Sequence, residues 1–325
     1  MNIAFAGLRH NHIYVLFDEA KSDTNFKVIG AFEEDTEAKN LATEKGLICN
    51  YNSFEELLED ENVDIVALGG CYADRGQMAI KALEKGKHII ADKPLCTYLE
   101  ELHEIEKLSS ENDLLVSCMF TLRFNKKINA LKKLVESGAL GEINNVYFGG
   151  QHPLQYGRRP KWYFEEGKHG GVINDIAIHG IDVLNYALGL EVNTILSARC
   201  WNKFAFSEPN FLDSAQFMLT AKNGAGIIAD VSYAIPDGIE FDLPYYWQFN
   251  IWGTLGTISF SLNEKESYYY VKGKKEANLL EEEDVKISYL ADFYNLIKGE
   301  NKAILPVSDV ILSTRKTLEI QKCSL

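Results

Sequence analysis

Short apolar runs alternate with mixed polar and apolar stretches through the first third of the chain. Five of these runs have the length of strands: residues 2–6, 26–32, 63–69, 88–91 and 114–120. Stretches of helical length separate them, and Ser53 with Glu56 and Thr97 with Glu100 have the spacing of a capping box at a helix start. Strands that are apolar throughout and separated by helices indicate an α/β domain whose parallel sheet is covered on both faces.

The pattern changes after residue 121. Helices are predicted at residues 125–137, 169–188, 285–298 and 308–323. Between the second and third of them lie strand-like stretches at residues 195–201, 214–220, 226–233, 247–252 and 257–262. Turn signals such as Lys222-Asn223-Gly224 favour hairpins, and hairpins favour an antiparallel sheet. We therefore predict a first domain of residues 1–121 and an α+β domain of residues 122–325 with a large, mostly antiparallel sheet.

Composition narrows the function classes. The chain has 325 residues, which is long enough for two domains with separate cores. Its formal charge of −14 would repel a phosphate backbone, so nucleic acid is not an expected partner. The six cysteines form no C-x-x-C pair, and we find neither a basic leader nor a long apolar run. These features favour a cytoplasmic protein, away from membranes, that acts on a small molecule.

The first strand leads into Gly7-Leu8-Arg9-His10-Asn11-His12, the dinucleotide loop. In dinucleotide-binding folds, three glycines at the first, third and sixth positions let the backbone approach a pyrophosphate. Here Arg9 and His12 replace the second and third glycines, and Arg9 can pair with a phosphate directly. We take Gly7, Arg9, His10 and His12 as candidate cofactor contacts. The two histidines could suggest a metal, but no neighbouring carboxylate or cysteine completes a tetrahedral set, so we expect none.

The second strand ends at Glu33, which lies 21 residues after His12 and can accept hydrogen bonds from ribose hydroxyls. Glu34 and Asp35 follow it and would repel a 2′-phosphate. NAD is therefore favoured over NADP. The alternative interpretation is a solvated acidic turn.

Two further segments carry candidate chemistry. The strand in residues 86–94 delivers Asp92 and Lys93 to the carboxyl edge of the sheet, where open parallel sheets bind ligands, although a lysine is more often a surface residue. In residues 170–182, Asp175 and His179 are four positions apart, with Asp182 a turn further on. A carboxylate can then orient an imidazole that exchanges protons, or the pair can simply stabilise a helix.

The order of these motifs, G-K-H-I-I-A-D-K-P and then G-G-V-I-N-D-I-A-I-H-G-I-D, resembles the Gfo/Idh/MocA family over nearly the whole chain. The resemblance implies a Rossmann-type first domain and an NAD(P)-dependent dehydrogenase or reductase. It also implies that Lys93 hydrogen-bonds the reacting oxygen, His179 exchanges its proton and Asp175 positions the substrate or the histidine. Asp92, Lys93 and Pro94 would contact the cofactor. The chain departs from the family pattern at Asp92 and Ala177, and residues 72–75 lack its common T-P-N-x-x-H run.

The implied substrate is a secondary alcohol, or the matching carbonyl, of a sugar, inositol or related polyol. Candidate substrate contacts, besides the catalytic residues, are Arg123, Tyr156, Arg158 and Trp162. The segment that holds the last three could instead be a dimer contact or solvated surface. The aromatic residues between Tyr245 and Trp252 predict sheet core or a subunit interface, and we expect a homodimer or homotetramer formed through the C-terminal sheet. A ligand-sensing or repressor-like protein, and a glycoside-processing enzyme with tightly held NAD, are alternatives.

Overall fold

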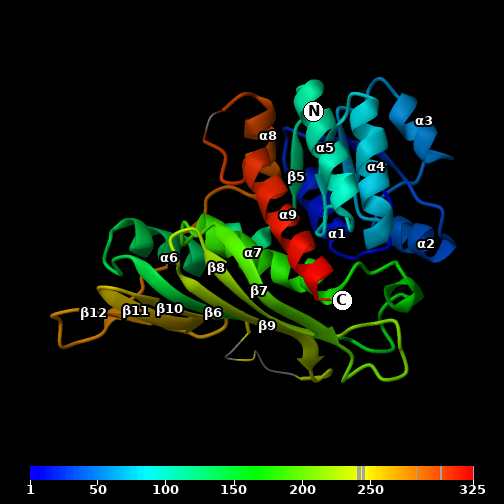
Figure 1. The fold of residues 1–325 in the computed structure, drawn as a ribbon. Coiled ribbons are helices and arrows are strands. Elements are labelled where there is room, and N and C mark those ends of the chain that lie inside the picture. The colour runs from blue at the N-terminus through cyan, green and yellow to red at the C-terminus, as the bar shows by residue number, and fades with distance from the viewer. Residues whose placement is uncertain (240–242, 244–245, 283, 301, 325) are drawn as a thin grey trace. The chain divides into compact units, whose positions relative to one another are not determined.

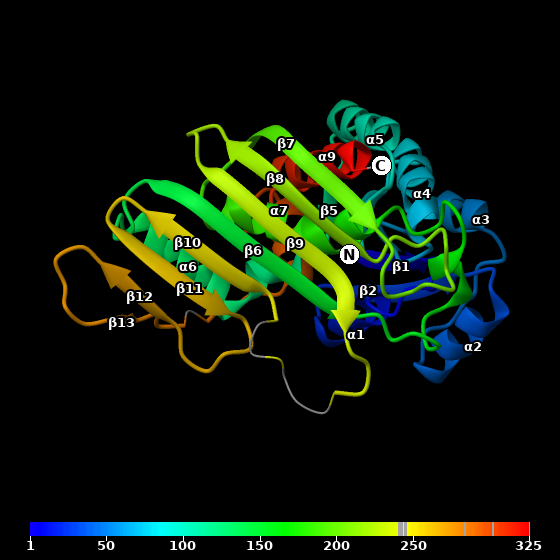
Figure 2. The same ribbon diagram turned by 60° about the horizontal axis from the view of Figure 1, so that its bottom comes forward.

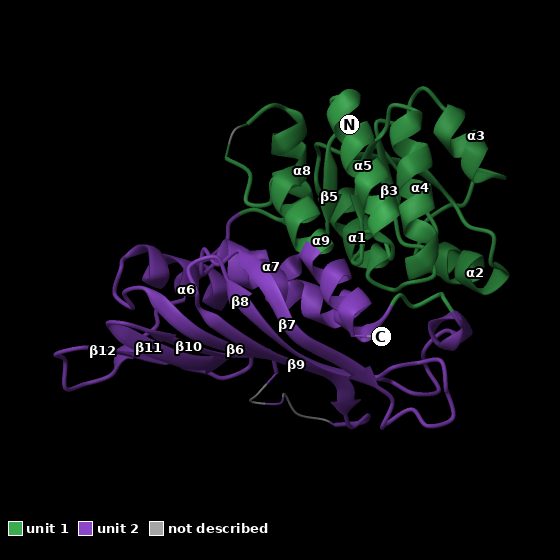
Figure 3. Ribbon diagram, in the orientation of Figure 1, with its two compact units in different colours: residues 1–119, 167–170, 287–315 green, residues 120–166, 171–286, 316–325 purple. Residues whose placement is uncertain are grey.

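The structure is a computed structural model that describes all residues except 240–242, 244–245, 283, 301 and 325. The chain divides into two compact units (Figure 3). Unit 1 comprises Met1–Met119, Gly167–Gly170 and Ile287–Arg315, and unit 2 comprises Phe120–Glu166, Gly171–Lys286 and Lys316–Leu325. The first break lies close to the predicted one, but residues 287–315 belong to unit 1, whereas the sequence pattern placed them in the second domain. Tyr245 lies outside the described residues.

Unit 1 is built on a five-stranded sheet in the order β2-β1-β3-β4-β5, with every neighbouring pair parallel. Its strands are β1 (Asn2–Ala6), β2 (Lys27–Phe32), β3 (Ile65–Leu68), β4 (His88–Ala91) and β5 (Val116–Cys118). All residues of β3 are buried, as expected for a strand covered on both faces. The predicted parallel α/β domain is confirmed.

The helices of unit 1 are α1 (Ile13–Ser22), α2 (Thr36–Glu44), α3 (Phe54–Glu59), α4 (Tyr72–Glu84), α5 (Leu99–Glu111), α8 (Tyr289–Ile297) and the first part of α9 (Val307–Cys323). Helices α1 to α5 connect the strands of its sheet, and α8 with the first part of α9 joins the unit from far downstream in the chain (Figure 1). Ser53 caps α3 as predicted, since its Oγ accepts the Glu56 N–H at 3.0 Å. The predicted Thr97 cap is wrong, because α5 has Tyr98 at its N-cap and the Thr97 N–H donates to the Glu101 carboxylate.

Unit 2 contains an eight-stranded sheet in the order β13-β12-β11-β10-β6-β9-β8-β7. The strands are β6 (Ile143–Pro153), β7 (Val192–Trp201), β8 (Ser214–Ala221), β9 (Gly226–Ile235), β10 (Gln248–Gly253), β11 (Gly256–Ser261), β12 (Tyr268–Val271) and β13 (Asn278–Leu279). The central pair β6 and β9 is parallel and the other pairs are antiparallel, which confirms a mostly antiparallel sheet. Gly224 turns the β8–β9 hairpin with a φ of +90°.

The helices of unit 2 lie on one face of this sheet, and Figure 2 shows the opposite, open face. They are α6 (Lys126–Glu136), α7 (Ile178–Tyr186) and the last part of α9, with 3-10 turns at Thr121–Phe124 and Lys161–Phe164 and a π-helical turn, η3, at Ile173–Ala177. The predicted continuous helix over residues 169–188 is therefore wrong at its start. Residues 172–184 are buried throughout, so no apolar periodicity marks the change of helix type. Within the described chain, no helix is both long and apolar enough to cross a membrane.

Candidate functional site

Four parallel strands of unit 1 end at one edge of its sheet. The residues that follow β1, β2, β3 and β4 are Gly7, Glu33, Gly69 and Asp92. Most cofactor residues expected from the sequence therefore stand at the carboxyl edge, where ligands bind to sheets of this type.

Glycine is required at position 7 because the backbone of Gly70 lies close to it. Its φ is +69°, and a Cβ at this position would lie 2.6 Å from the backbone of Gly70. No other residue fits without moving the end of β3. Gly70 was not singled out from the sequence, although the Gly69-Gly70 pair after an apolar strand was a visible signal for a close approach.

Glu33 is buried, with 3% of its surface exposed, so the alternative of a solvated acidic turn is wrong. Its carboxylate accepts the backbone N–H groups of Leu8, Glu34 and Asp35 and pairs with Arg9 Nε at 3.3 Å. Glu33 thus ties the dinucleotide loop to the end of β2. Its contact with ribose stays a prediction, as does the contact of Arg9 with phosphate.

The tip of the dinucleotide loop presents backbone donors. Asn11 and His12 are exposed, and neither backbone N–H donates a hydrogen bond to another described residue. Together with the close approach at Gly7, these donors fit a diphosphate, which binds to N–H groups at a helix start. The loop therefore fits a dinucleotide despite its missing glycines.

Asp92 is wholly buried and faces three basic side chains. Its Oδ2 accepts from Arg75 Nη2 at 3.0 Å and from Nδ1 of His10, and its Oδ1 lies 3.4 Å from His12 Nδ1. His10 contacts the Tyr72 hydroxyl through Nε2 at 3.0 Å. The sequence argument that no carboxylate stands near the two histidines is therefore wrong, because Asp92 lies 82 positions after His10 in the chain. Asp92 and His10 are both buried in these contacts, and their contact with the cofactor stays a prediction.

The charge state of this cluster follows from burial and from Arg75. Burial by itself would raise the pKa of Asp92, but His10 and Arg75 hold that pKa well below its usual value. Burial lowers the pKa of His10 to about 4 against the attraction of Asp92, so the histidine is neutral near pH 7. The permanent charge of Arg75 therefore keeps Asp92 ionised.

Arg75 also holds the backbone around Lys93. Its Nη1 donates to the carbonyl oxygens of Asp92 at 2.8 Å, Lys93 at 2.6 Å and Pro94 at 3.2 Å. The Lys93-Pro94 peptide is cis, and the Lys93 side chain is largely buried. Sequence reasoning missed Arg75 as a site residue, although it stands in the segment that departs from the family pattern.

In unit 2, Asp175 lies on the π-helical turn and is buried. Its Oδ2 accepts from the hydroxyl of Tyr163 at 2.8 Å and from that of Tyr233, and the two hydroxyls are 3.1 Å apart. His179 follows at the start of α7, with its ring edge-on to Phe120 and Trp247. The π-helical turn is a further feature of this region, because such turns occur frequently at functional sites. Neither tyrosine was singled out from the sequence.

Arg123, a candidate substrate contact, lies against Asp182 in unit 2. The two residues form a bidentate ion pair, with Arg123 Nε donating to Asp182 Oδ2 at 2.8 Å and Nη2 to Oδ1 at 2.7 Å. Both side chains are wholly buried, and the Arg123 guanidinium lies 4.7 Å from the Tyr186 ring centre. The pair joins the 3-10 turn at Thr121–Phe124 to α7, and contact of Arg123 with a substrate stays a prediction.

The remaining candidates lie on or near residues 154–164 of unit 2. Trp162 is buried beside Tyr163, whereas Tyr156 and Arg158 are exposed. The Tyr156 hydroxyl lies within hydrogen-bond distance of Ser207 and Glu208. Contact of these residues with a substrate stays a prediction.

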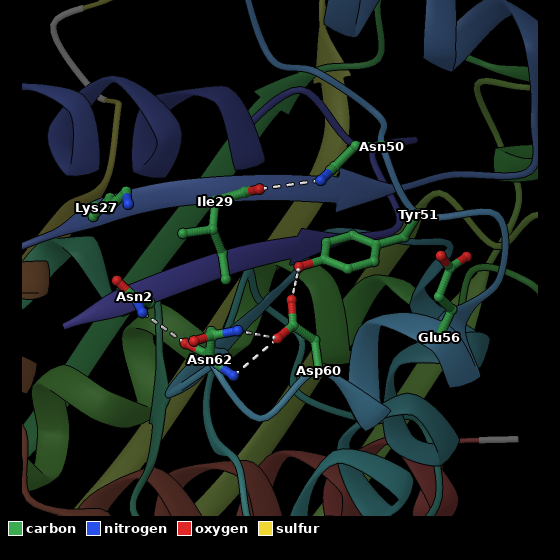
Figure 4. A pocket seen from close by; sticks show the side chains of 8 residues that line it. All are labelled: Asn2, Lys27, Ile29, Asn50, Tyr51, Glu56, Asp60 and Asn62. Atoms are coloured by element: carbon green, nitrogen blue, oxygen red, sulfur yellow. Dashed lines mark hydrogen bonds between the residues drawn. The ribbon is translucent and has the colours of Figure 1, made fainter.

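A separate hollow of about 480 Å³ opens at the opposite end of the unit 1 sheet (Figure 4). Its polar groups bond to one another, since Tyr51 and Asn62 both donate to Asp60, and Asn50 bonds to β2. It lies at the amino ends of β1 and β2, away from the edge with the candidate residues. We therefore do not assign it to the functional site.

Comparison with known proteins identifies the class of protein. Residues 1–120 match the model of the oxidoreductase family with an NAD-binding Rossmann fold, so the chain is an NAD-binding oxidoreductase. Residues 128–259 match the Gfo/Idh/MocA C-terminal domain. The chain therefore belongs to the Gfo/Idh/MocA family.

Its relatives include named dehydrogenases. The scyllo-inositol 2-dehydrogenase (NAD(+)) of Bacillus subtilis (strain 168) is 27% identical over 202 residues, which cover 62% of this chain and 58% of that protein. The myo-inositol 2-dehydrogenase of Thermotoga maritima is 25% identical over 218 residues, which cover 67% of this chain and 62% of that protein. Both alignments span less than two thirds of the relative. Among solved structures, an NAD-binding protein from Listeria innocua shares the fold at a TM-score of 0.80 with 21% identity, covering 99% of this chain and 97% of that one.

Proposed function

We propose that the chain transfers a hydride between NAD and a carbon that bears a secondary hydroxyl in a sugar, an inositol or a related polyol. The observation that carries the proposal is the buried group of Asp175, Tyr163 and Tyr233 one turn before His179. Such a group suits recognition of hydroxyls and transfer of a proton. The names of the inositol dehydrogenase relatives support the substrate class.

In this proposal, His179 takes the proton of the substrate hydroxyl when the alcohol is oxidised. Loss of a hydride leaves positive character on carbon, and departure of the hydroxyl proton relieves it. Lys93 donates a hydrogen bond to the same oxygen and stabilises the alkoxide charge that develops there. Asp175, held by two phenol groups, positions the substrate or the imidazole. Arg75 acts as a positioning residue, because it holds the backbone carbonyl of Lys93.

The cofactor residues follow from the edge of the unit 1 sheet. The backbone at Gly7 and the N–H groups of Asn11 and His12 would hold the diphosphate, and Glu33 would bind the ribose after a small opening of the loop. Bound NAD supplies the hydride acceptor. The acidic residues Glu33, Glu34 and Asp35 disfavour the extra phosphate of NADP.

The test is NADH formation by the purified chain with a panel of inositols, hexoses, pentoses and acyclic polyols. Turnover is expected with NAD and at least one polyol, and weaker turnover with NADP. Lys93→Met and His179→Ala should each lower kcat/KM by about a thousandfold or more. Their dissociation constant for NAD should stay within about threefold of the parent value, as it should for the control Lys85→Met on an exposed side chain.

The outcomes separate the alternatives. NAD binding without NADH formation on any polyol would contradict the proposal and favour a sensor. Product formation without release of free NADH would favour an enzyme that retains its cofactor. Full turnover in either variant would reject the assigned roles.

We further propose that copies of the chain associate through the open face of the unit 2 sheet. Met218 and Ile228 lie opposite each other on β8 and β9, with 47% and 51% of their surfaces exposed. Trp252 on β10 and Tyr270 on β12 both pair with Thr257, which places them on one face. Exposed apolar residues gathered on a sheet favour an interface. A cytoplasmic location is part of the same proposal, in line with six cysteines that form no disulfide.

A further inference from the structure

Two imidazoles and one carboxylate of unit 1 are gathered where the dinucleotide loop meets the end of β4. One ring nitrogen of His10, one of His12 and a carboxylate oxygen of Asp92 all lie within 4.8 Å of one another. The two histidine rings are edge to face, with centroids 4.5 Å apart. From this juxtaposition we propose that His10, His12 and Asp92 bind a divalent transition-metal ion such as Zn²⁺.

The carboxylate has one oxygen available for such an ion. Oδ2 of Asp92 is engaged by His10 and by Arg75 Nη2 at 3.0 Å. Oδ1 is buried and accepts no hydrogen bond from the described part of the chain, while His12 Nδ1 stands 3.4 Å away. Carboxylates that ligate metals are commonly held by a further hydrogen bond, and Arg75 supplies one here.

His10 is held in the same manner. Its Nε2 lies 3.0 Å from the Tyr72 hydroxyl, which fixes the ring with Nδ1 toward Asp92. Metal-binding histidines usually have such a partner on the other ring nitrogen. The positive charge of Arg75 beside Asp92 weakens attraction for a second cation, so micromolar rather than nanomolar affinity is expected.

Access and geometry depend on His12. Its side chain is 52% exposed, so an ion can enter from solvent. Tetrahedral ligands of zinc lie roughly 3.4 Å apart, which is the distance from His12 Nδ1 to Asp92 Oδ1. An ion bound to Nδ1 of His10 would replace the contact of that nitrogen with Oδ2, which Arg75 still holds. Imidazole with carboxylate suits Zn²⁺, Co²⁺ or Ni²⁺, whereas Mg²⁺ and Ca²⁺ prefer sites made of oxygen ligands alone.

The site goes beyond the proposed hydride transfer, because it needs neither substrate nor turnover. A bound ion would link the loop after β1 to the residue that precedes Lys93. It would thereby restrain the loop that the cofactor contacts.

Direct metal binding tests the inference. The untagged full-length chain, freed of metal by a chelator, is titrated with ZnCl₂ in a calorimeter and with CoCl₂ in a spectrophotometer. We expect about one Zn²⁺ per chain and the visible absorption of tetrahedral Co²⁺. His12→Ala should weaken Zn²⁺ binding at least tenfold and abolish the Co²⁺ spectrum. MgCl₂ should produce no saturable heat.

Two further variants show whether binding depends on the proposed ligands. His103→Ala removes an exposed histidine on α5 and should leave Zn²⁺ affinity unchanged. Tyr72→Phe removes only the outer partner of His10 and should weaken binding by about tenfold to a hundredfold. Absence of saturable Zn²⁺ binding, or binding that survives His12→Ala at full strength, would overturn the proposal. Loss of binding in His103→Ala would place the ion elsewhere and overturn it equally.

Discussion

Arg123 and Asp182 form a bidentate ion pair in which neither side chain is exposed to solvent. The pair joins the 3-10 turn at Thr121–Phe124 to α7, the helix that carries His179. Removing one partner leaves a buried charge without its counterion. Removing one partner therefore lowers the free energy of unfolding more than replacing both partners with apolar residues of the same size does.

Arg123→Met is therefore expected to lower the free energy of unfolding by about 3–5 kcal/mol. The double variant Arg123→Met with Asp182→Leu should recover much of this loss, because no buried charge remains. Urea denaturation followed by circular dichroism measures both. Arg199→Met, at an exposed arginine on β7, serves as the control and should change stability by less than about 0.5 kcal/mol. A single variant as stable as the parent would show that the pair is dispensable.

Gly180 allows α7 to lie close to the sheet of unit 2. A Cβ at this position would stand 2.2 Å from the ring of Phe148 on β6. Gly180→Ala should therefore cost about 1–3 kcal/mol through overpacking, despite the better helix propensity of alanine. Gly226→Ala on β9 is the matched control, because its Cβ would meet only Asn145 at 3.4 Å. Equal thermal midpoints for the two variants would contradict the packing argument.

Glu101 on α5 gives a prediction for pH. Burial raises the pKa of its carboxyl, although Gln77 and the Thr97 amide hydrogen-bond to it. The folded chain therefore binds this proton more tightly than the unfolded chain, in which the pKa of the glutamate is 4.5. Stability contributed by this group is full below pH 4.5 and is lost as the pH rises through the folded pKa.

Glu101→Gln removes this dependence while it keeps an acceptor for Gln77. The thermal midpoint of the variant relative to the parent should increase as the pH is raised from about 4 to 7. Differential scanning calorimetry across this range measures the effect. A variant that becomes relatively less stable toward pH 7 would show that the ionised carboxylate stabilises the fold.

The open face of the unit 2 sheet predicts an effect on assembly. Met218→Lys combined with Ile228→Lys places two charges among the exposed apolar residues of this face. If copies associate through this face, the double variant should sediment as a monomer while the parent does not. Ile48→Lys, at an exposed residue of unit 1, is the control. A monomeric parent, or a double variant of unchanged mass, would contradict this interface.

Local patterns were sufficient for much of the fold. The five parallel strands of unit 1 were visible as apolar runs, because buried strands carry no polar face. The Lys222-Asn223-Gly224 turn predicted the β8–β9 hairpin through residues that adopt its backbone angles. The start of the helix at residues 169–188 was not predictable, because a segment buried on all sides has no periodicity.

The spacing of residues in the sequence does not predict which side chains contact the candidate site residues. Motifs led to the prediction of Lys93, Asp175 and His179 as catalytic residues. They did not indicate Arg75, which holds the carbonyl of Lys93, or Tyr163 and Tyr233, which contact Asp175. The contacts of Asp92 with His10 and Arg75 were not predicted, because they depend on the parallel strand order β1-β3-β4. Pairings between strand ends depend on topology, which residue spacing does not encode.

The discontinuity of unit 1 has a practical consequence for engineering. Since α8 and the first half of α9 are encoded far downstream of β5, a fragment cut after residue 119 would expose the surface they cover. Grafting the nucleotide module of a relative onto this chain therefore requires transplanting the counterpart of residues 287–315 together with that of residues 1–119. Circular permutation that fuses them offers the simplest route to an autonomous module.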